Sequence, residues 1–217
     1  AVLIIVMSVM NGFRTELINK IVGFNPHVTV KPYDNPIDYK KLNNELNSIS
    51  QNLILSNSSE AIIIREQNSK GVILRGYLEE DFSKLELINN KNFLGKNKRI
   101  KKNSISIGRE LSFILDLNIG DNITLMSSSG IKTIIGNLPK QQTFTVTSIF
   151  ESGLADFDSN VIFLNLNTLE KFSNLLVKDR NLEIYLKNPK NIDEQKNIIQ
   201  KVYPNDLVFT WADMNRS

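Results

Sequence analysis

The most constraining feature of this sequence is an apolar run at its start, which turns amphipathic before it ends. From Ala1 to Met10 only Ser8 is polar. A helix of about 10 residues rises only about 15 Å, which is half of the hydrocarbon core of a bilayer. Beyond the run, apolar residues recur at helical spacing on one face, at Phe13, Leu17, Ile18, Ile21 and Val22.

This pattern predicts the outer end of a transmembrane helix and its stalk over residues 1–23, ending near Gly23 and before Pro26. On this interpretation residue 1 is a cut and not a natural start. A second interpretation stays open, because an apolar run of this length also suits an ordinary buried N-terminal helix. A signal peptide fits less well, since no basic segment precedes the run and no small-x-small cleavage site follows it.

Composition narrows the class of protein further. The chain has 217 residues, of which 41% are apolar, so it can form one large domain or two small ones. Its 26 basic and 23 acidic residues leave a charge of +3, which gives no reason to expect nucleic acid as a partner. Because there is no cysteine, disulfides, zinc-thiolate sites and cysteine nucleophiles are all excluded.

The two ends of the chain share one order of elements. Near the start, the pattern predicts a strand, a helix and a hairpin of two strands, over 27–33, 37–49, 59–66 and 71–78. Toward the end it predicts a strand, a helix and a strand, over 181–187, 192–203 and 207–211. Two β-α-β units of matching size, separated in sequence, are what a ferredoxin-like split βαβ domain needs. We therefore predict an α+β fold with one discontinuous domain, into which the middle of the chain is inserted.

The middle, residues 79–178, predicts a second, β-rich domain. Its expected elements are two helices over 108–117 and 166–176, and three strands over 122–126, 142–150 and 160–165. Between the first two strands lies a connection, 127–140, rich in Ser and Gly yet carrying Ile131, Ile134, Ile135 and Leu138. Burying one such side chain is worth roughly 1.5–3 kcal/mol. Either a partner covers these residues or the connection folds back on its own domain.

Motifs for catalysis are missing. The sequence has no G-x-S-x-G, no H-E-x-x-H and no G-x-x-x-x-G-K-[ST], so we expect no enzyme, no cofactor and no bound ATP. The single His27 opens a strand and suits a structural or surface role. Asp156 and Asp158 are interpreted as turn residues, since they lack the other oxygens of a calcium loop. The basic passage over 96–102 is expected to be a solvated loop; its other interpretation is contact with an anionic membrane surface.

Several passages resemble the LolC/LolE family of lipoprotein-releasing permeases, within the MacB-like group of ABC transporter permeases. They are IVMSVMNGFRTEL with IVGFNPHVTV, SISIGRELSFILDLNIGDNITLMS, GNLPKQQTFTV, ESGLADFDSNVIFLNL and TWADMNRS. The resemblance implies a Porter-like subdomain over 24–78 and 179–217, interrupted by a Sabre-like subdomain over 79–178. It also implies a periplasmic location, beside the bacterial inner membrane.

The resemblance further implies a protruding hairpin, the hook, at about 128–142, which docks the periplasmic chaperone LolA. The passage G-N-L-P-K-Q resembles the hook's G-x-L-P-x-Q, which makes its chaperone-binding residues Ile134, Ile135, Gly136, Asn137, Leu138, Pro139, Lys140 and Gln141. A hook favours a LolC-like protein or the single hybrid permease of some bacteria. This interpretation gives the apolar residues of the connection a partner.

The other implied partners are a separate LolD-like ATPase, a second permease subunit or second copy, and lipoprotein acyl chains at the membrane. Met7, Met10 and Phe13 are candidates for the start of an apolar lipoprotein path, because flexible Met surfaces accept varied ligands; packing against a second transmembrane helix explains them equally well. Two other functions stay open. One is a MacB-like efflux or mechanotransmission permease domain, and the other is an extracytoplasmic ligand-sensing domain with an enclosed polar pocket.

Overall fold

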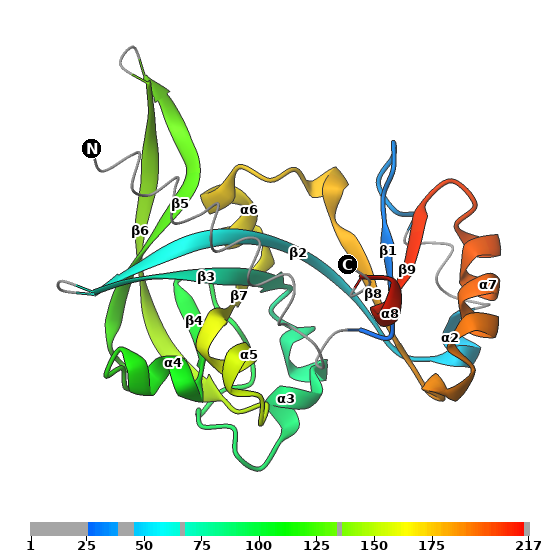
Figure 1. Ribbon diagram of the computed structural model, residues 1–217, viewed down its shortest axis with the longest axis horizontal. Helices are drawn as coiled ribbons and strands as arrows, with labels where there is room; N and C mark the ends of the chain where they lie inside the picture. Colours follow the sequence, from blue (N-terminus) through cyan, green and yellow to red (C-terminus); the bar gives the residue numbers. More distant parts are fainter. Residues whose placement is uncertain (1–25, 39–45, 66–67, 134–135, 215–217) are drawn as a thin grey trace. The chain divides into compact units, whose positions relative to one another are not determined.

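The computed structural model describes residues 26–38, 46–65, 68–133 and 136–214 of the chain (Figure 1). These residues form two compact units, and the chain passes from one unit to the other after Asn57 and again after Leu175. We call residues 58–175 the central unit, and residues 26–57 with 176–214 the terminal unit. Both contain helices and strands, so the fold is mixed α and β, as predicted, and it is rich in sheet.

The terminal unit is a sheet with helices beside it. Its strands are β1 (Val28–Lys31), the first half of β2 (Ser50–Arg65), β8 (Asn181–Leu186) and β9 (Leu207–Thr210). They lie in the order β2-β8-β1-β9, and every neighbouring pair is antiparallel. The helical elements are α2 (Leu46–Ile49), η3 (Val177–Asp179), η4 (Pro189–Asn191), α7 (Ile192–Val202) and α8 (Trp211–Met214).

The core of the terminal unit follows from the alternation of its strands. Val28 and Val30 point to one face of β1, where they pack with Leu182 and Ile184 of β8 and with Ile199 of α7. All five side chains are fully buried. The sequence prediction of a helix over 192–203 is confirmed by α7, and its apolar residues Ile192, Ile199 and Val202 pack on the sheet.

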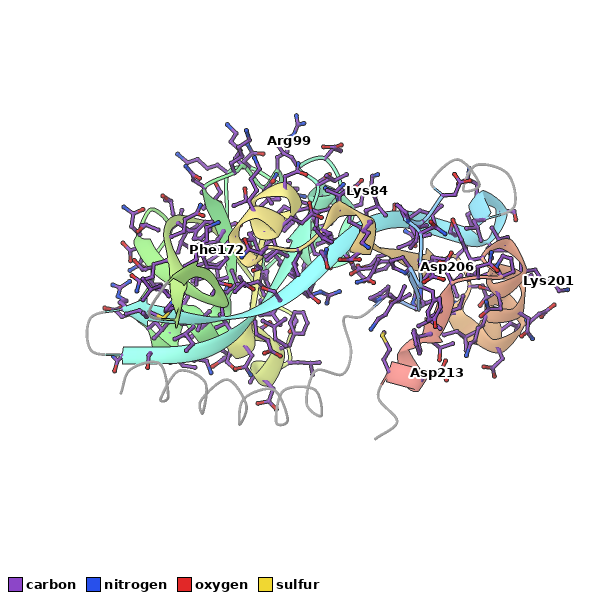
Figure 2. The ribbon with its side chains drawn as sticks, turned by 90° about the horizontal axis from the view of Figure 1, so that it is seen from above. Lys84, Arg99, Phe172, Lys201, Asp206 and Asp213 are labelled. Atoms are coloured by element: carbon purple, nitrogen blue, oxygen red, sulfur yellow. The ribbon has the colours of Figure 1, made fainter. Side chains whose placement is uncertain are left out.

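Helix α8 begins with a capping box. The Thr210 backbone N–H donates to Asp213 Oδ2 at 2.8 Å, and the Asp213 N–H donates to Thr210 Oγ1 at 3.2 Å. Lys196 of α7 also donates to this carboxylate, at 2.7 Å. Hydrogen bonds from the Lys196 ammonium, which contributes most, and from the backbone N–H and the hydroxyl of Thr210 hold the pKa of Asp213 well below its usual range. Figure 2 shows Asp213 at the end of the terminal unit.

The central unit is a sheet that closes on itself. Its strands are the second half of β2, β3 (Asn68–Tyr77), β4 (Ser104–Gly108), β5 (Asn122–Thr133), β6 (Gly136–Phe150) and β7 (Val161–Asn165). They are paired in the order β3-β7-β4-β6-β5-β2, and β2 also pairs with β3, so the six strands form a ring. The pairs β3–β7 and β4–β6 are parallel.

The short helices of the central unit are η2 (Phe82–Lys84), α3 (Glu86–Asn89), α4 (Arg109–Ile114), α5 (Ala155–Asn160) and α6 (Leu166–Ser173). Helix α6 contributes to the core through Leu169 and Phe172 (Figure 2). The Phe172 ring stands edge-on to the ring of Phe144 in β6, with 5.9 Å between the ring centroids. Its ends are capped: the Asn165 side chain accepts from the Thr168 N–H, and Asn174 takes a left-handed conformation.

Two of the departures from the sequence predictions concern long strands of the sheet. Strand β2 begins at Ser50 instead of residue 59, because its polar first half is held by backbone pairing with β8. Strands β5 and β6 continue through most of 127–140, which was predicted as a connection. The expected helix over 37–49 is described only from Leu46, and the expected N-terminal helix with Met7, Met10 and Phe13 lies outside the described residues. Within the part described, no helix is long and apolar enough to cross a membrane.

Candidate functional site

The hairpin of β5 and β6 is the candidate site. The two strands are paired from Asn122 and Thr145 at the base to Thr133 and Gly136 at the far end. Near the base each has a second neighbour: β2 pairs with β5 up to Ser127, and β4 pairs with β6 from Thr145. Past these points neither outer edge is paired with another described strand. Figure 1 shows the two arms extending well beyond β2 and β3 of the same unit.

A bulge marks the point where the hairpin leaves the ring. Ser127 is opposite Lys140, but the next pair is Gly130 with Pro139, so Ser128 and Ser129 are extra residues on β5. The Ser129 N–H donates to Ser127 Oγ at 3.1 Å, which satisfies one backbone group that the bulge leaves without a ladder partner. A Cβ on Gly130 would overlap the Leu138 backbone oxygen, so this position requires glycine.

Exposure changes along the hairpin. Leu125 and Phe144, below the bulge, are buried in the core of the ring, whereas the Leu138 side chain is 52% exposed. Pro139 and Lys140 are half-buried and Gln141 is exposed. Leu138 is therefore an apolar side chain exposed on the part of the hairpin that has no further described strand beside it.

The structure describes part of the predicted chaperone-binding set. It brings Leu138, Pro139, Lys140 and Gln141 together on one arm, and it pairs the backbones of Gly136 and Asn137 with the other arm. Ile134 and Ile135 lie outside the described residues. The apolar residues of this stretch marked it as unusual for a connection. They did not predict the bulge or the exposure of Leu138.

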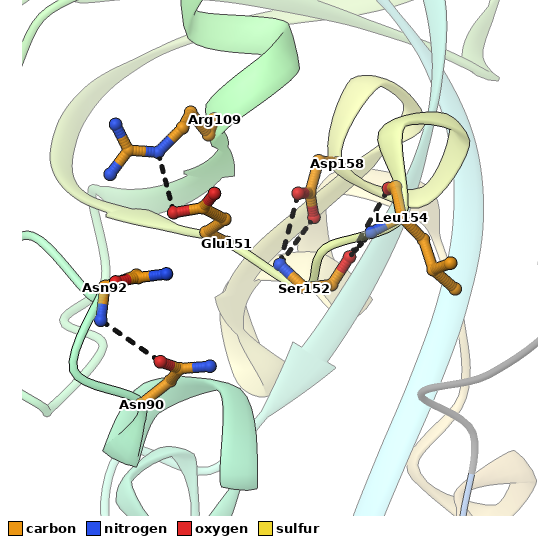
Figure 3. Close-up of polar contacts among 7 residues, drawn as sticks. All are labelled: Asn90, Asn92, Arg109, Glu151, Ser152, Leu154 and Asp158. Atoms are coloured by element: carbon orange, nitrogen blue, oxygen red, sulfur yellow. Dashed lines mark hydrogen bonds and ion pairs between the residues drawn. The ribbon is translucent and has the colours of Figure 1, made fainter.

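The passage Glu151 to Asn160 forms a joint, and the prediction of turn residues there was wrong. It contains helix α5, and the Asp158 carboxylate accepts the Ser152 N–H at 3.0 and 3.1 Å (Figure 3). Asp158 is buried, and burial raises the pKa of its carboxyl against the opposing effect of these hydrogen bonds. Across the joint, Arg109 of α4 forms an ion pair with Glu151 at 3.0 Å.

The joint also explains one glycine of the passage SISIGRE. A Cβ on Gly108, between β4 and α4, would overlap the backbone of Asp158. The contact is with main-chain atoms, which cannot move aside as a flexible side chain can. The close approach at Gly108 therefore packs the start of α4 directly against the main chain of α5.

His27 and the basic passage have the roles expected of them. The His27 Nδ1 atom accepts the Leu186 N–H at 2.8 Å, so the imidazole supports the terminal sheet. Residues 96–99 are exposed; the Lys98 ammonium donates to Asn89 at 3.0 Å, and Arg99, 3.4 Å from Glu79, points outward (Figure 2). Within the described ranges no His, Asp or Glu cluster is arranged to hold a metal ion.

The terminal unit carries a cleft of about 450 Å³ between residues 33–38 and 202–206. Its lining includes Asp34, Asp38 and Asp206, and the aromatic ring of Tyr33 is 69% exposed. The cleft is polar, but most of its lining residues are exposed.

Comparison with known proteins identifies relatives of the chain. No protein-family model matches it. The "Lipoprotein-releasing system transmembrane protein LolC" of Neisseria meningitidis serogroup B is 25% identical over 224 residues, which cover 99% of this chain and 54% of the relative. The LolC of Buchnera aphidicola subsp. Schizaphis graminum is 29% identical over 217 residues, 96% of this chain and 52% of the relative. The LolC of Xylella fastidiosa strain Temecula1 is 25% identical over 175 residues, 78% and 42%.

Solved structures give more distant likenesses. The periplasmic region of MacB from Actinobacillus actinomycetemcomitans is 10% identical with a TM-score of 0.48, covering 91% of this chain and 94% of that one. The extracellular domain of the ABC-type transporter YknZ from Gram-positive bacteria is 11% identical with a TM-score of 0.46, covering 84% and 100%.

The class of protein that these relatives represent is the transmembrane protein of a lipoprotein-releasing system. The particular protein that the chain resembles is LolC, at 25–29% identity over most of its length. The chain spans about half the length of the curated relatives it matches.

Proposed function

We propose that this chain is the periplasmic domain of an inner-membrane ABC transporter permease that releases lipoproteins and passes them to a LolA-like chaperone. The observation that carries the proposal is Leu138, an exposed apolar side chain on a hairpin that projects past its own sheet, in a chain related to LolC. Residues 128–142 are then the hook, and the chaperone covers Leu138 and its neighbours.

The proposed docking contact is small. A few apolar anchors on a narrow hairpin bury too little surface for permanent assembly, so a transient contact of micromolar order, about 8 kcal/mol, is expected. Such an affinity suits a chaperone that must leave with its cargo. The bulge and the required glycine at 130 support the proposal, since they hold the register of both arms and therefore the position of Leu138.

The proposal assigns a non-catalytic role to the chain. ATP hydrolysis is carried out by a LolD-like ATPase, and a second permease subunit or second copy completes the transporter. Each acyl CH₂ transferred into water costs about 0.8 kcal/mol, so extraction of a lipoprotein requires both that energy source and an apolar path. Met7, Met10 and Phe13 remain candidates for the beginning of the path.

The fold is consistent with the proposed architecture. In the terminal unit, β1 lies between β8 and β9, and β2 lies beyond β8, which is the strand order of a split βαβ domain. We propose this unit as the Porter-like subdomain and the β-rich ring as the Sabre-like subdomain. The boundaries 24–78, 79–178 and 179–217 remain predictions, and this assignment differs from them by placing residues 58–78 with the ring.

The proposal is tested by trimming the hairpin. Ser127 and Lys140 face each other in the register, so residues 128–139 can be replaced by a two-residue Asn-Gly turn that closes the remaining strands. We expect the immobilised wild-type chain to retain its cognate LolA and the trimmed chain to lose it. Equal retention by both chains would refute hairpin docking; no retention by either would instead favour a MacB-like efflux role.

A ligand-sensing domain is the second candidate function, and the cleft of the terminal unit is the observation in its favour. We rank it lower because the sensing function expects an enclosed pocket, whereas Tyr33 and most of its neighbours in the cleft are exposed.

A further inference from the structure

The C-terminal turn of α6 has a contact that the docking proposal does not use. The last carbonyls of a helix lack partners within the helix. Here the Glu170 oxygen accepts from the N–H groups of Asn174 and Leu175, as in a left-handed helix end. The next carbonyl, that of Lys171, accepts from the ammonium of Lys140 at 2.6 Å.

This contact is favourable for two reasons. It satisfies a terminal carbonyl, and it places a positive charge at the negative end of the α6 dipole. The two residues are 31 positions apart, and Lys140 belongs to β6, so the contact joins the hairpin to a helix of the ring. Lys140 stands opposite Ser127, directly below the bulge, at the point where the hairpin loses its other strand neighbours.

The same turn of α6 also contacts the two segments at which the chain enters and leaves the central unit. Ser173, the last residue of α6, shares a hydrogen bond of 2.6 Å with Ser59 on β2. Ser59 follows the first crossing, after Asn57, and the chain leaves the central unit again at Leu175. One helix end therefore contacts the hairpin base, the incoming strand and the outgoing segment.

A contact at the base of the hairpin has a large effect on the position of its far end. A two-stranded hairpin has little stability of its own, so its direction is set at its base. From Lys140 to Gly136 the arm reaches roughly 13 Å at about 3.3 Å per residue, and a tilt of about 10° at the base moves its end by about 2 Å.

We propose that the C-terminal turn of α6 anchors the hairpin and that Lys140 is the positioning residue of this anchor. The consequence for chaperone docking rests on the proposed function, whereas the anchor itself does not.

The test measures the direction of the hairpin without a chaperone. Because the chain has no cysteine, two spin labels can be placed without other changes, at Leu138→Cys on the hairpin and at Glu86→Cys, which is exposed on α3. The distribution of distances between the labels is then recorded by pulsed electron paramagnetic resonance for four chains: with Lys140 intact, Lys140→Met, Lys140→Arg and Lys171→Met.

Lys140→Met removes the donor and keeps the aliphatic stem, and we expect it to widen the distribution roughly twofold. Lys140→Arg keeps a charged donor and should restore the narrow distribution. Lys171→Met removes a neighbouring charge but leaves the accepting backbone oxygen, so it should change nothing. Equal widths in all four chains would overturn the anchor, as would equal widening by Lys140→Met and Lys171→Met.

The two proposals fail separately. If the cognate LolA does not bind and Lys140→Met still widens the distribution, the docking function is wrong and the anchor stands. If LolA binds in the trimming experiment and the widths are all equal, the docking function stands and the anchor is wrong.

Discussion

Two glycines of the central unit are both required by the close approach of another backbone, but one lies near the core and the other lies in the exposed hairpin. A Cβ on Gly108 would overlap the Asp158 backbone, and a Cβ on Gly130 would overlap the Leu138 backbone. Gly108 packs against the joint, at the main chain of the buried residue Asp158. Gly130 lies in the hairpin, where the facing Leu138 side chain is 52% exposed.

The two glycines therefore serve different properties: one serves the stability of the unit, and the other serves the position of an exposed side chain. In the joint, close approach of two backbones lets α4 and α5 bury apolar surface, so the glycine contributes to the stability of the whole unit. In the hairpin, close approach buries little, and what it fixes is the register and hence the position of Leu138. Replacing each glycine should therefore affect different properties of the protein.

Gly108→Ala is expected to have the largest effect. The added methyl group meets main-chain atoms of Asp158, and relief requires α5 to move away from the ring. We expect the free energy of unfolding to fall by about 3 kcal/mol, measured by urea denaturation. A loss below about 1 kcal/mol would show that the joint yields easily and that the comparison is overstated.

Gly130→Ala is expected to destabilise the chain by only about 1 kcal/mol, because the strained region is outside the core. It should nevertheless shift the register at the bulge and reduce LolA capture at least roughly tenfold, a difference of about 1.4 kcal/mol in binding. Ser129→Ala is the matched control, since it keeps the backbone N–H that donates to Ser127. Loss of capture in both variants would mean that any change in the bulge disrupts docking.

The buried carboxyl of Asp158 should make the stability of the protein depend on pH. A carboxyl whose pKa is raised on folding holds its proton more tightly in the folded chain, so its contribution to stability is present at low pH and is lost as pH rises through the raised pKa. Asp158→Asn keeps the shape and an acceptor for Ser152 but does not titrate. The free energy of unfolding of wild type minus that of Asp158→Asn should therefore fall as the pH rises above the ordinary pKa of an aspartate, about 4.

Denaturation of both chains over a series of rising pH values checks this prediction, with Asp156→Asn, exposed on the same helix, as the control substitution. A difference that grows with pH would show that the hydrogen bonds from Ser152 outweigh burial.

The fold was predictable from the sequence where periodicity controls it. The predicted helix over 192–203 and the predicted strands over 71–78 and 160–165 lie within a few residues of α7, β3 and β7. The first half of β2 was missed because Ser, Gln and Asn dominate it, and its strand character comes from backbone pairing with β8. Asp158 was taken for a turn residue because a short polar sequence does not show that its carboxylate will be buried.

The candidate site was predictable only in part. The apolar residues within 127–140 marked the stretch as unusual, and the resemblance to LolC supplied a role for it. The bulge was not predictable, since Ser and Gly favour a loop as much as a strand end. The contact of Lys140 with the Lys171 carbonyl joins residues that no local pattern relates.

The most direct test of the account is a calorimetric titration of the cognate LolA into three chains: wild type, Leu138→Glu and Leu207→Glu. Leu207 of β9 is 45% exposed, which matches Leu138 in residue type and nearly in exposure. We expect wild type and Leu207→Glu to bind with micromolar affinity and Leu138→Glu not to bind, while Leu138→Glu loses less than about 0.5 kcal/mol of unfolding free energy. Binding by Leu138→Glu at the wild-type affinity, or a loss of stability above about 2 kcal/mol, would contradict the claim that this leucine is held out for a partner.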